Sequence, residues 1–132
     1  MKTIEDLVCS ITQMETLKAL GFDLSKAKWV WFKWGIFNTR TVAQLDKDFD
    51  SLYPNCGLKI PTYSEVDMME ILPQKIDSDY SLFILQLNGV WNISYRYYGL
   101  NNYPMEIYMH SSESLRDALF SELLILKHEN KI

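Results

Sequence analysis

The sequence predicts an α+β fold in which an antiparallel sheet of three or four strands is covered on one face by helices. Residues 80–98 contain two apolar, aromatic-rich runs on either side of Asn88-Gly89. Further along the chain, residues 105–109 alternate in polarity as a third strand would. Apolar residues recur at helical spacing near both ends of the chain. We therefore expect an N-terminal helix, a short middle helix and a C-terminal helix packed on the sheet.

Residues 80–98 predict a β-hairpin. Asn-Gly supplies the two positive-φ residues of a type I′ turn, which fixes the register of the flanking strands. The pairs expected from that register are Leu87 with Val90, Ile84 with Ile93, and Leu82 with Tyr95. Side chains alternate between faces. One face then holds Tyr80, Leu82, Ile84, Gln86, Trp91, Ile93, Tyr95 and Tyr97, and the other holds Ser81, Phe83, Leu85, Leu87, Val90, Asn92, Ser94 and Arg96.

The first third of the chain predicts a helix and then a strand. Thr3 can cap a helix that ends at Gly21, with apolar residues at helical spacing: Ile4, Leu7, Val8, Ile11, Met14 and Leu17. Residues 28–34 are rich in residues that favour strands, and a turn is expected at Gly35. Residues 35–62 stay open: 41–52 is either a helix with Val42, Leu45, Phe49 and Leu52 on one face, or an irregular segment that ends at Pro54 and Gly57.

The two remaining helices are expected before and after the hairpin in the sequence. Either Thr62 with Glu65 or Ser64 with Asp67 can start a short helix that stops at Pro73. After a loop at 99–104 and the strand at 105–109, Ser111 or Ser112 is expected to cap the last helix. Its apolar stripe comprises Leu115, Ala118, Leu119, Leu123 and Leu126, widened by Phe120, Leu124 and Ile125.

Composition indicates a globular, cytoplasmic protein. A chain of 132 residues with 48% apolar and 23% charged residues has the size of one domain, so we expect a single domain over residues 1–132. No apolar run approaches the ~20 residues of a spanning helix, and acids stand where a secretory signal would be hydrophobic. Cys9 and Cys56 lack a CxxC partner, which favours reduced, structural thiols.

The charge distribution argues against nucleic-acid binding. The net charge is -4, and residues 67–132 hold five Lys or Arg against nine acids. Nucleic-acid surfaces gain much of their affinity by neutralising phosphates. Residues 26–40 nevertheless combine rings with cations, as a single-strand platform does: Trp29, Trp31, Phe32, Trp34 and Phe37 with Lys26, Lys28, Lys33 and Arg40. A nucleic-acid-associated regulator therefore stays the alternative, although core packing also explains these rings.

The aromatic content favours a protein partner. Four Trp and eight Tyr exceed what a core of this size fully hides, and both residue types are enriched in binding hot spots. The residues that we expect to contact a partner are Trp31, Trp34, Tyr97, Tyr98, Tyr103 and Tyr108. The partner's identity and the oligomeric state stay open, a homodimer included.

No motif predicts catalysis, a cofactor or a metal. Asp46, Asp48 and Asp50 alternate as at the start of a calcium loop, but Ser51 and Gly57 replace the required glycine and glutamate. His110, expected after the third strand, and His128, near the end of the last helix, have no ligand partner at a recognisable spacing. An enzyme would need a deep pocket that gathers one of these histidines with carboxylates. We therefore expect a non-enzymatic protein.

Several segments resemble small proteins of phages, prophages and mobile elements of Bacteroides-type gut bacteria. They are residues 14–23, which end in a leucine-glycine-aspartate pattern, residues 60–66, and Ile71-Leu72-Pro73. The strand pair 80–87 and 90–98 with Trp91, and a closing helix over 114–130, complete the layout. The resemblance carries no activity or catalytic residue to this chain. It implies only an origin in a phage or mobile element. Together with the aromatic content, our best hypothesis is then an interaction module that modulates a host factor or a defence system.

A second, weaker resemblance is to antitoxin-like domains, in which a three-stranded meander precedes a helix that opens with Ser and acidic residues. It adds to the alternative of a nucleic-acid-associated regulator that uses residues 26–40. Fold alone does not imply function, so the arrangement carries no site residues.

Overall fold

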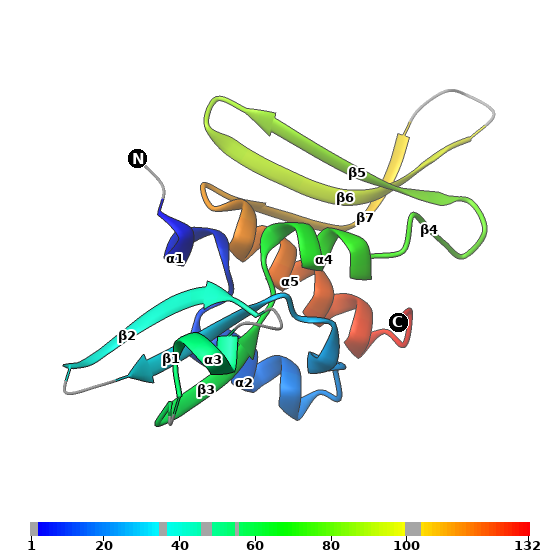
Figure 1. The fold of residues 1–132 in the computed structure, drawn as a ribbon. Coiled ribbons are helices and arrows are strands. Elements are labelled where there is room, and N and C mark those ends of the chain that lie inside the picture. Colours follow the sequence, from blue (N-terminus) through cyan, green and yellow to red (C-terminus); the bar gives the residue numbers. More distant parts are fainter. Residues whose placement is uncertain (1–2, 35–36, 46–48, 55, 100–103) are drawn as a thin grey trace. The chain divides into compact units, whose positions relative to one another are not determined.

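The chain folds into helices and antiparallel sheets, as expected for an α+β protein (Figure 1). The computed structural model describes residues 3–34, 37–45, 49–54, 56–99 and 104–132. Its two compact units are Met1–Asp67 and Met68–Ile132, and each is treated by itself. The expectation of a single domain remains a prediction.

The first unit holds a three-stranded antiparallel sheet of order β2-β1-β3. Its strands are β1 (Trp29–Trp34), β2 (Phe37–Gln44) and β3 (Leu58–Thr62). The helices α1 (Ile4–Leu7) and α2 (Ile11–Ala19) and the 3-10 helix η1 (Leu24–Lys26) precede the sheet, and the single-turn helix α3 (Phe49–Leu52) lies between β2 and β3. The strand expected at 28–34 is confirmed.

Strand β1 buries alternate residues. Val30 and Phe32 lie in a core with Phe49, against which Ala43, Leu45, Tyr53 and Cys56 also pack. The rings of Phe32 and Phe49 meet edge to face with centroids 5.2 Å apart, a geometry that aromatic pairs prefer. Residues 41–52 therefore follow neither expected alternative: the segment up to Gln44 pairs with β1, Phe49–Leu52 is helical, and residues 46–48 lie outside the described residues.

The N-terminal helix was expected to run unbroken to Gly21, and that prediction is wrong. Thr3 starts α1, since its N–H donates to the Asp6 carboxylate at 3.1 Å. The helix then stops because Val8 forms a β-bridge with Ser64 and the Cys9 N–H donates to the Tyr63 carbonyl at 2.8 Å. Ser10 caps α2, because its hydroxyl accepts from the Gln13 N–H and its N–H donates to the Gln13 side chain.

The second unit holds a four-stranded antiparallel sheet of order β4-β5-β6-β7. Its strands are β4 (Lys75–Ile76), β5 (Tyr80–Leu87), β6 (Val90–Tyr98) and β7 (Pro104–Ser112). The hairpin register is confirmed: Leu87 pairs with Val90, Ile84 with Ile93, and Leu82 with Tyr95. The sequence was expected to form one sheet, whereas the described residues form two.

Helix α5 (Leu115–His128) packs on β6 and β7. It buries the whole expected stripe of Leu115, Ala118, Leu119, Leu123 and Leu126. Its cap is Ser114, whose hydroxyl accepts from the Asp117 N–H at 3.2 Å. The expectation of Ser111 or Ser112 was wrong because the third strand, expected at 105–109, extends to Ser112 and takes up both residues. His110 accordingly lies within β7.

The short middle helix α4 (Glu65–Ile71) begins at Ser64 and ends before Pro73. The Ser64 N–H donates to the Asp67 carboxylate at 3.0 Å, and the Asp67 N–H donates to the Ser64 hydroxyl at 3.1 Å. Of the two caps that the sequence allowed, Ser64 with Asp67 is therefore the one used. In the described part of the chain, no helix is both long and apolar enough to cross a bilayer.

Candidate functional site

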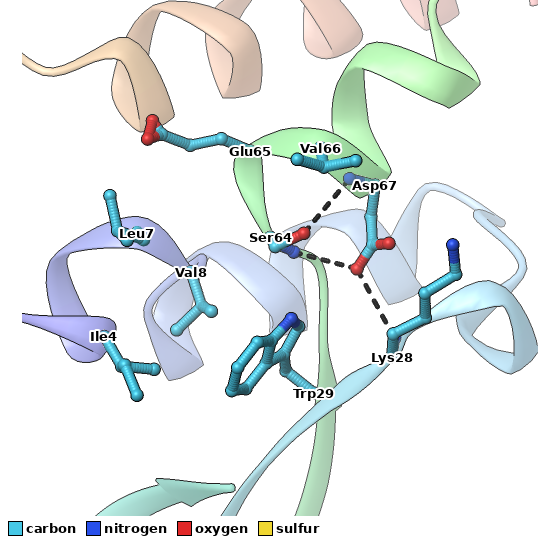
Figure 2. Close-up of a pocket in the computed structure, with 9 residues that line it drawn as sticks. All are labelled: Ile4, Leu7, Val8, Lys28, Trp29, Ser64, Glu65, Val66 and Asp67. Atoms are coloured by element: carbon cyan, nitrogen blue, oxygen red, sulfur yellow. Dashed lines mark hydrogen bonds between the residues drawn. The ribbon is translucent and has the colours of Figure 1, made fainter. Parts of the chain in front are cut away.

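An apolar hollow of about 300 Å³ in the first unit is the leading candidate site (Figure 2). Three elements meet around it: helix α1, the start of β1, and the first turn of α4. The lining residues are Ile4, Leu7, Val8, Lys28, Trp29, Ser64, Glu65, Val66 and Asp67. This volume lies at the lower end of the range for ligand sites in proteins, so the hollow can hold one or two apolar side chains.

Exposed aliphatic side chains surround the hollow. Val66 is 57% exposed, Ile4 46% and Leu7 38%. Single exposed aliphatic residues are ordinary on protein surfaces, but a group of them at one concavity is typical of a binding site. Figure 2 shows Ile4, Leu7 and Val8 on one side and Val66 on the other, with the Trp29 ring beside Ile4 and below Val8 in this view.

A buried carboxylate fixes the polar side of the hollow. Asp67 is 3% exposed, and its Oδ2 accepts from the N–H groups of Ser64, at 3.0 Å, and Lys28, at 3.4 Å. These bonds hold the start of α4 against the start of β1. Because Trp29 and Val66 adjoin the bonded residues, the same contacts position the ring and one aliphatic wall.

The aromatic residues predicted to contact a partner lie in different environments. The Trp31 ring is half-buried, and its N–H donates to the Cys9 carbonyl at 2.7 Å. Tyr97 is half-buried with its ring 5.8 Å from that of Tyr80, whereas Tyr98 is 58% exposed. Tyr108 is half-buried at a φ of 55°. Tyr103 and the side chain of Trp34 lie outside the described residues.

Among the predicted residues that the structure describes, Tyr98 is the exposed one, and adjacent positions such as 97 and 98 face opposite sides of β6. Of the predicted aromatic residues of the second unit, the described ones, Tyr97, Tyr98 and Tyr108, are therefore not all exposed on one face. Trp29 and the aliphatic groups of the hollow were not predicted as partner contacts. In the sequence, the apolar residues within 4–8 could have indicated the aliphatic groups, but we assigned them to the apolar face of a helix.

The basic and aromatic segment 26–40 divides between surface and core. Phe32 is 2% exposed and packs on Phe49, so its ring is not available for stacking on a base. Lys26, Lys28 and Arg40 are exposed. The side chain of Phe37, like that of Trp34, is outside the described part of the chain. No observation here favours the nucleic-acid alternative.

A histidine and a glutamate that the sequence did not connect form a pair in the second unit. His110 Nδ1 lies 2.8 Å from Glu122 Oε2, and the Glu122 side chain is fully buried. Burial raises the pKa of Glu122 to about 8, and burial lowers the pKa of His110. At neutral pH the pair can therefore share one proton. In the sequence, the buried glutamate could have been recognised from its position on the apolar stripe of α5. Glu122 lies three residues after Leu119 and four before Leu126.

His110 also lines an open hollow of about 330 Å³ together with Ser121, Leu124, Ile125 and His128. Glu122 lies behind His110 and does not line it. Within the ranges that the model describes, no group of three or more His, Cys, Asp or Glu side chains is arranged to hold a metal ion. Asp50 contacts Lys59 Nζ at 3.2 Å, and Asp46 and Asp48 lie outside those ranges.

No protein-family model, curated protein or solved structure matches this chain. The resemblance to small proteins of phages and mobile elements therefore stays a prediction.

Proposed function

We propose that this chain is a non-enzymatic protein-interaction module that binds its partner at the hollow in residues 1–67. One observation carries the proposal: Ile4, Leu7 and Val66 remain exposed around a single concavity that Trp29 also lines. Covering a side chain of this kind contributes ~1.5–3 kcal/mol, so an apolar anchor inserted here would supply a large share of a binding energy.

The lining residues indicate the chemistry of the partner. Glu65 borders the hollow together with Lys28 and the buried Asp67, and Figure 2 shows Glu65 extending toward the side of the hollow near Leu7. The chain also has a net charge of -4. We therefore expect a protein segment that presents an apolar side chain next to a basic residue, because complementary charge sets register and speeds association.

The biological setting in this proposal follows from the sequence. The resemblance to proteins of phages and mobile elements points to a host factor or a component of a defence system as the partner. Cys9 and Cys56 are not joined in a disulfide, as suits a protein of the reducing cytoplasm.

The test is affinity capture of the tagged chain from nuclease-treated lysate of a Bacteroides-type host, with quantitative mass spectrometry. Val66→Asp places a charge at the hollow, on an exposed position in the first turn of α4 where an acid suits the helix dipole. Leu52→Asp is the matched control, because Leu52 is exposed and does not line the hollow. We expect one stoichiometric protein to be lost with Val66→Asp and retained with Leu52→Asp.

The purified partner should then show a Kd at least 10-fold weaker for Val66→Asp than for Leu52→Asp. Equal recovery with both variants would overturn the hollow as the site, and parallel capture with Tyr98→Ala would show whether the exposed tyrosine serves instead. Recovery of nucleic acid before nuclease treatment, with no protein afterwards, would overturn the proposal and favour the nucleic-acid-associated regulator.

A further inference from the structure

Strand β5 has an outer edge that is only partly paired. On the side away from β6, β4 pairs with Ser81 and Tyr80, and the Leu82 N–H donates to the Gln74 carbonyl at 2.9 Å. Across residues 83–87, the described part of the chain contains no strand on this side. Figure 1 shows β5 as a long strand along this margin of the sheet, whereas β4 is short and lies near its start.

The hairpin geometry identifies the groups on the open edge. In a two-residue hairpin the residues next to the turn, here Leu87 and Val90, exchange both backbone hydrogen bonds, and bonded pairs then alternate along the strands. Odd-numbered residues of β5 therefore bond to β6, and even-numbered residues point outward, as the bond of Leu82 to Gln74 confirms. Ile84 and Gln86 accordingly present their N–H and C=O groups at the open edge.

This edge lacks the features that usually prevent strand addition. Natural edge strands carry charges, prolines or bulges, but residues 80–87 contain no charged residue and no proline. The opposite edge of the sheet, β7, has all three. It starts at Pro104, it carries the acidic residue Glu106, and it has a bulge between its pairs to Ile93 and Tyr95, where Tyr108 adopts a positive φ. The edge of β5 is therefore open to strand addition, whereas that of β7 is protected.

We propose that a second copy of this chain pairs with β5 through its own β5, antiparallel and with Leu85 on the two-fold axis. Ile84 then pairs with the partner's Gln86, and Gln86 with the partner's Ile84. Both are bonded pairs, so the outward groups of each chain are satisfied by four hydrogen bonds. The two sheets join through β5 into one continuous sheet.

Side chains on one face support this register. Phe83, Leu85 and Leu87 alternate along β5, and Leu85 is 42% and Leu87 59% exposed. With Leu85 on the axis, Phe83 faces the partner's Leu87, and the two Leu85 side chains face each other at the close, non-bonded spacing. Each apolar side chain thus gains an apolar neighbour. No charge on residues 80–87 opposes the contact, although the whole chain is acidic.

The sheet itself limits the alternatives. β4 and Gln74 close the edge up to Leu82, and the Asn88-Gly89 turn ends it. The open run of residues 83–87 is centred on Leu85, so the two-fold register uses all of it. This inference is independent of the proposed function, because the hollow lies in the other unit.

The test combines mass in solution with amide exchange. Light scattering after size exclusion should give twice the chain mass of 15.5 kDa, and the Ile84 and Gln86 amides should be protected from deuterium exchange at concentrations where the dimer forms. Gln86→Pro removes an outward N–H and should yield monomer, since proline is tolerated at such edge positions. Gln86→Ala keeps the N–H and should remain dimeric.

A second variant guards against misfolding of the proline variant. Leu85→Lys places like charges on the two-fold axis at an exposed position and should also yield monomer with an unchanged circular dichroism spectrum. Met109→Lys, at an exposed residue of β7 outside the pairing, should leave the dimer intact. A chain that is monomeric at millimolar concentration, or a dimer that survives Leu85→Lys, would overturn the proposal.

Discussion

At the residue scale, Glu122 is the most unusual group in the described structure. A glutamate is almost never fully buried unless it is paired, and this one lies on the apolar stripe of α5 with His110 as its partner at 2.8 Å. The raised pKa of Glu122 and the lowered pKa of His110 have the same physical cause, because burial disfavours both charged forms.

Burial of Glu122 makes stability depend on pH. The folded chain retains the carboxyl proton up to a pKa of about 8, whereas the unfolded chain releases it near 4.5. The unfolded state therefore binds fewer protons in this window, and the free energy of unfolding falls as pH rises, by at most about 1.4 kcal/mol per pH unit. The stabilising contribution is complete below pH 4.5 and is lost as the pH passes 8.

Glu122→Gln should remove this dependence. Above pH 6.5 an unperturbed histidine is mostly neutral, and His110 has a lowered pKa, so between pH 6.5 and 8 the carboxyl is the member of the pair that titrates. In urea unfolding, the free energy of unfolding of Glu122→Gln should rise relative to that of the wild type by about 1 kcal/mol or more between pH 6.5 and 8. A stability difference that stays constant with pH would contradict the raised pKa.

At the element scale, the break between α1 and α2 shows how pairing overrides helical spacing. Six apolar residues suited one helix, yet Val8 and Cys9 form bridge and backbone bonds to the residues around Tyr63. The sequence did contain a sign of the break. Ser10 and Gln13 form a capping box, and the same pattern is evident in the spacing of their residue types.

Substitutions of Ser10 distinguish a cap from a helix interior. At an N-cap, Ala costs about 1 kcal/mol and Gly only a few tenths, so Ser10→Gly should be more stable than Ser10→Ala. Inside a continuous helix the order reverses, because Gly is about 1 kcal/mol worse than Ala. Urea denaturation of the two variants, compared with the wild type, gives the order directly. If Ser10→Ala proves more stable than Ser10→Gly, that order would contradict the break between α1 and α2.

At the scale of the whole molecule, the question is whether the two compact units unfold together. Helix α4 spans the division at residue 67, with Asp67 bonded to the N–H groups of Ser64 and Lys28 and Met68 fully buried. Unfolding of either unit disrupts part of this helix. We therefore expect one cooperative transition, in keeping with the single domain predicted from chain length.

The tryptophans allow this to be measured. Trp29, Trp31 and Trp34 lie in the first unit, and Trp91 in the second. In a Trp91→Phe variant, fluorescence reports residues 1–67 alone, whereas far-ultraviolet circular dichroism reports both units. We expect the two signals to give the same urea midpoint. Wild-type circular dichroism controls for the substitution, and separate midpoints would show that the units unfold independently.

The sequence by itself determined the hairpin and its register, the strand at 29–34 and the buried stripe of α5. These features depend on local turn chemistry and on periodicity, which neighbouring residues specify. Tertiary structure decided the second sheet, the end of α1 at the Val8 bridge and the strand pairing of β2 and β3 with β1. Each depends on pairing between residues far apart in the chain, as in Val8 with Ser64 and β1 with β3.

The same distinction applies to the candidate site. The aromatic content predicted exposed rings, but the exposure of a ring depends on whether another segment covers it. In the first unit, Phe32 packs on Phe49 and the Trp31 N–H donates to the Cys9 carbonyl. The hollow forms because α1, β1 and α4 converge there, although their lining residues are about 20 to 60 positions apart. Composition and periodicity carry no information on such convergence, so the site could be found only in three dimensions.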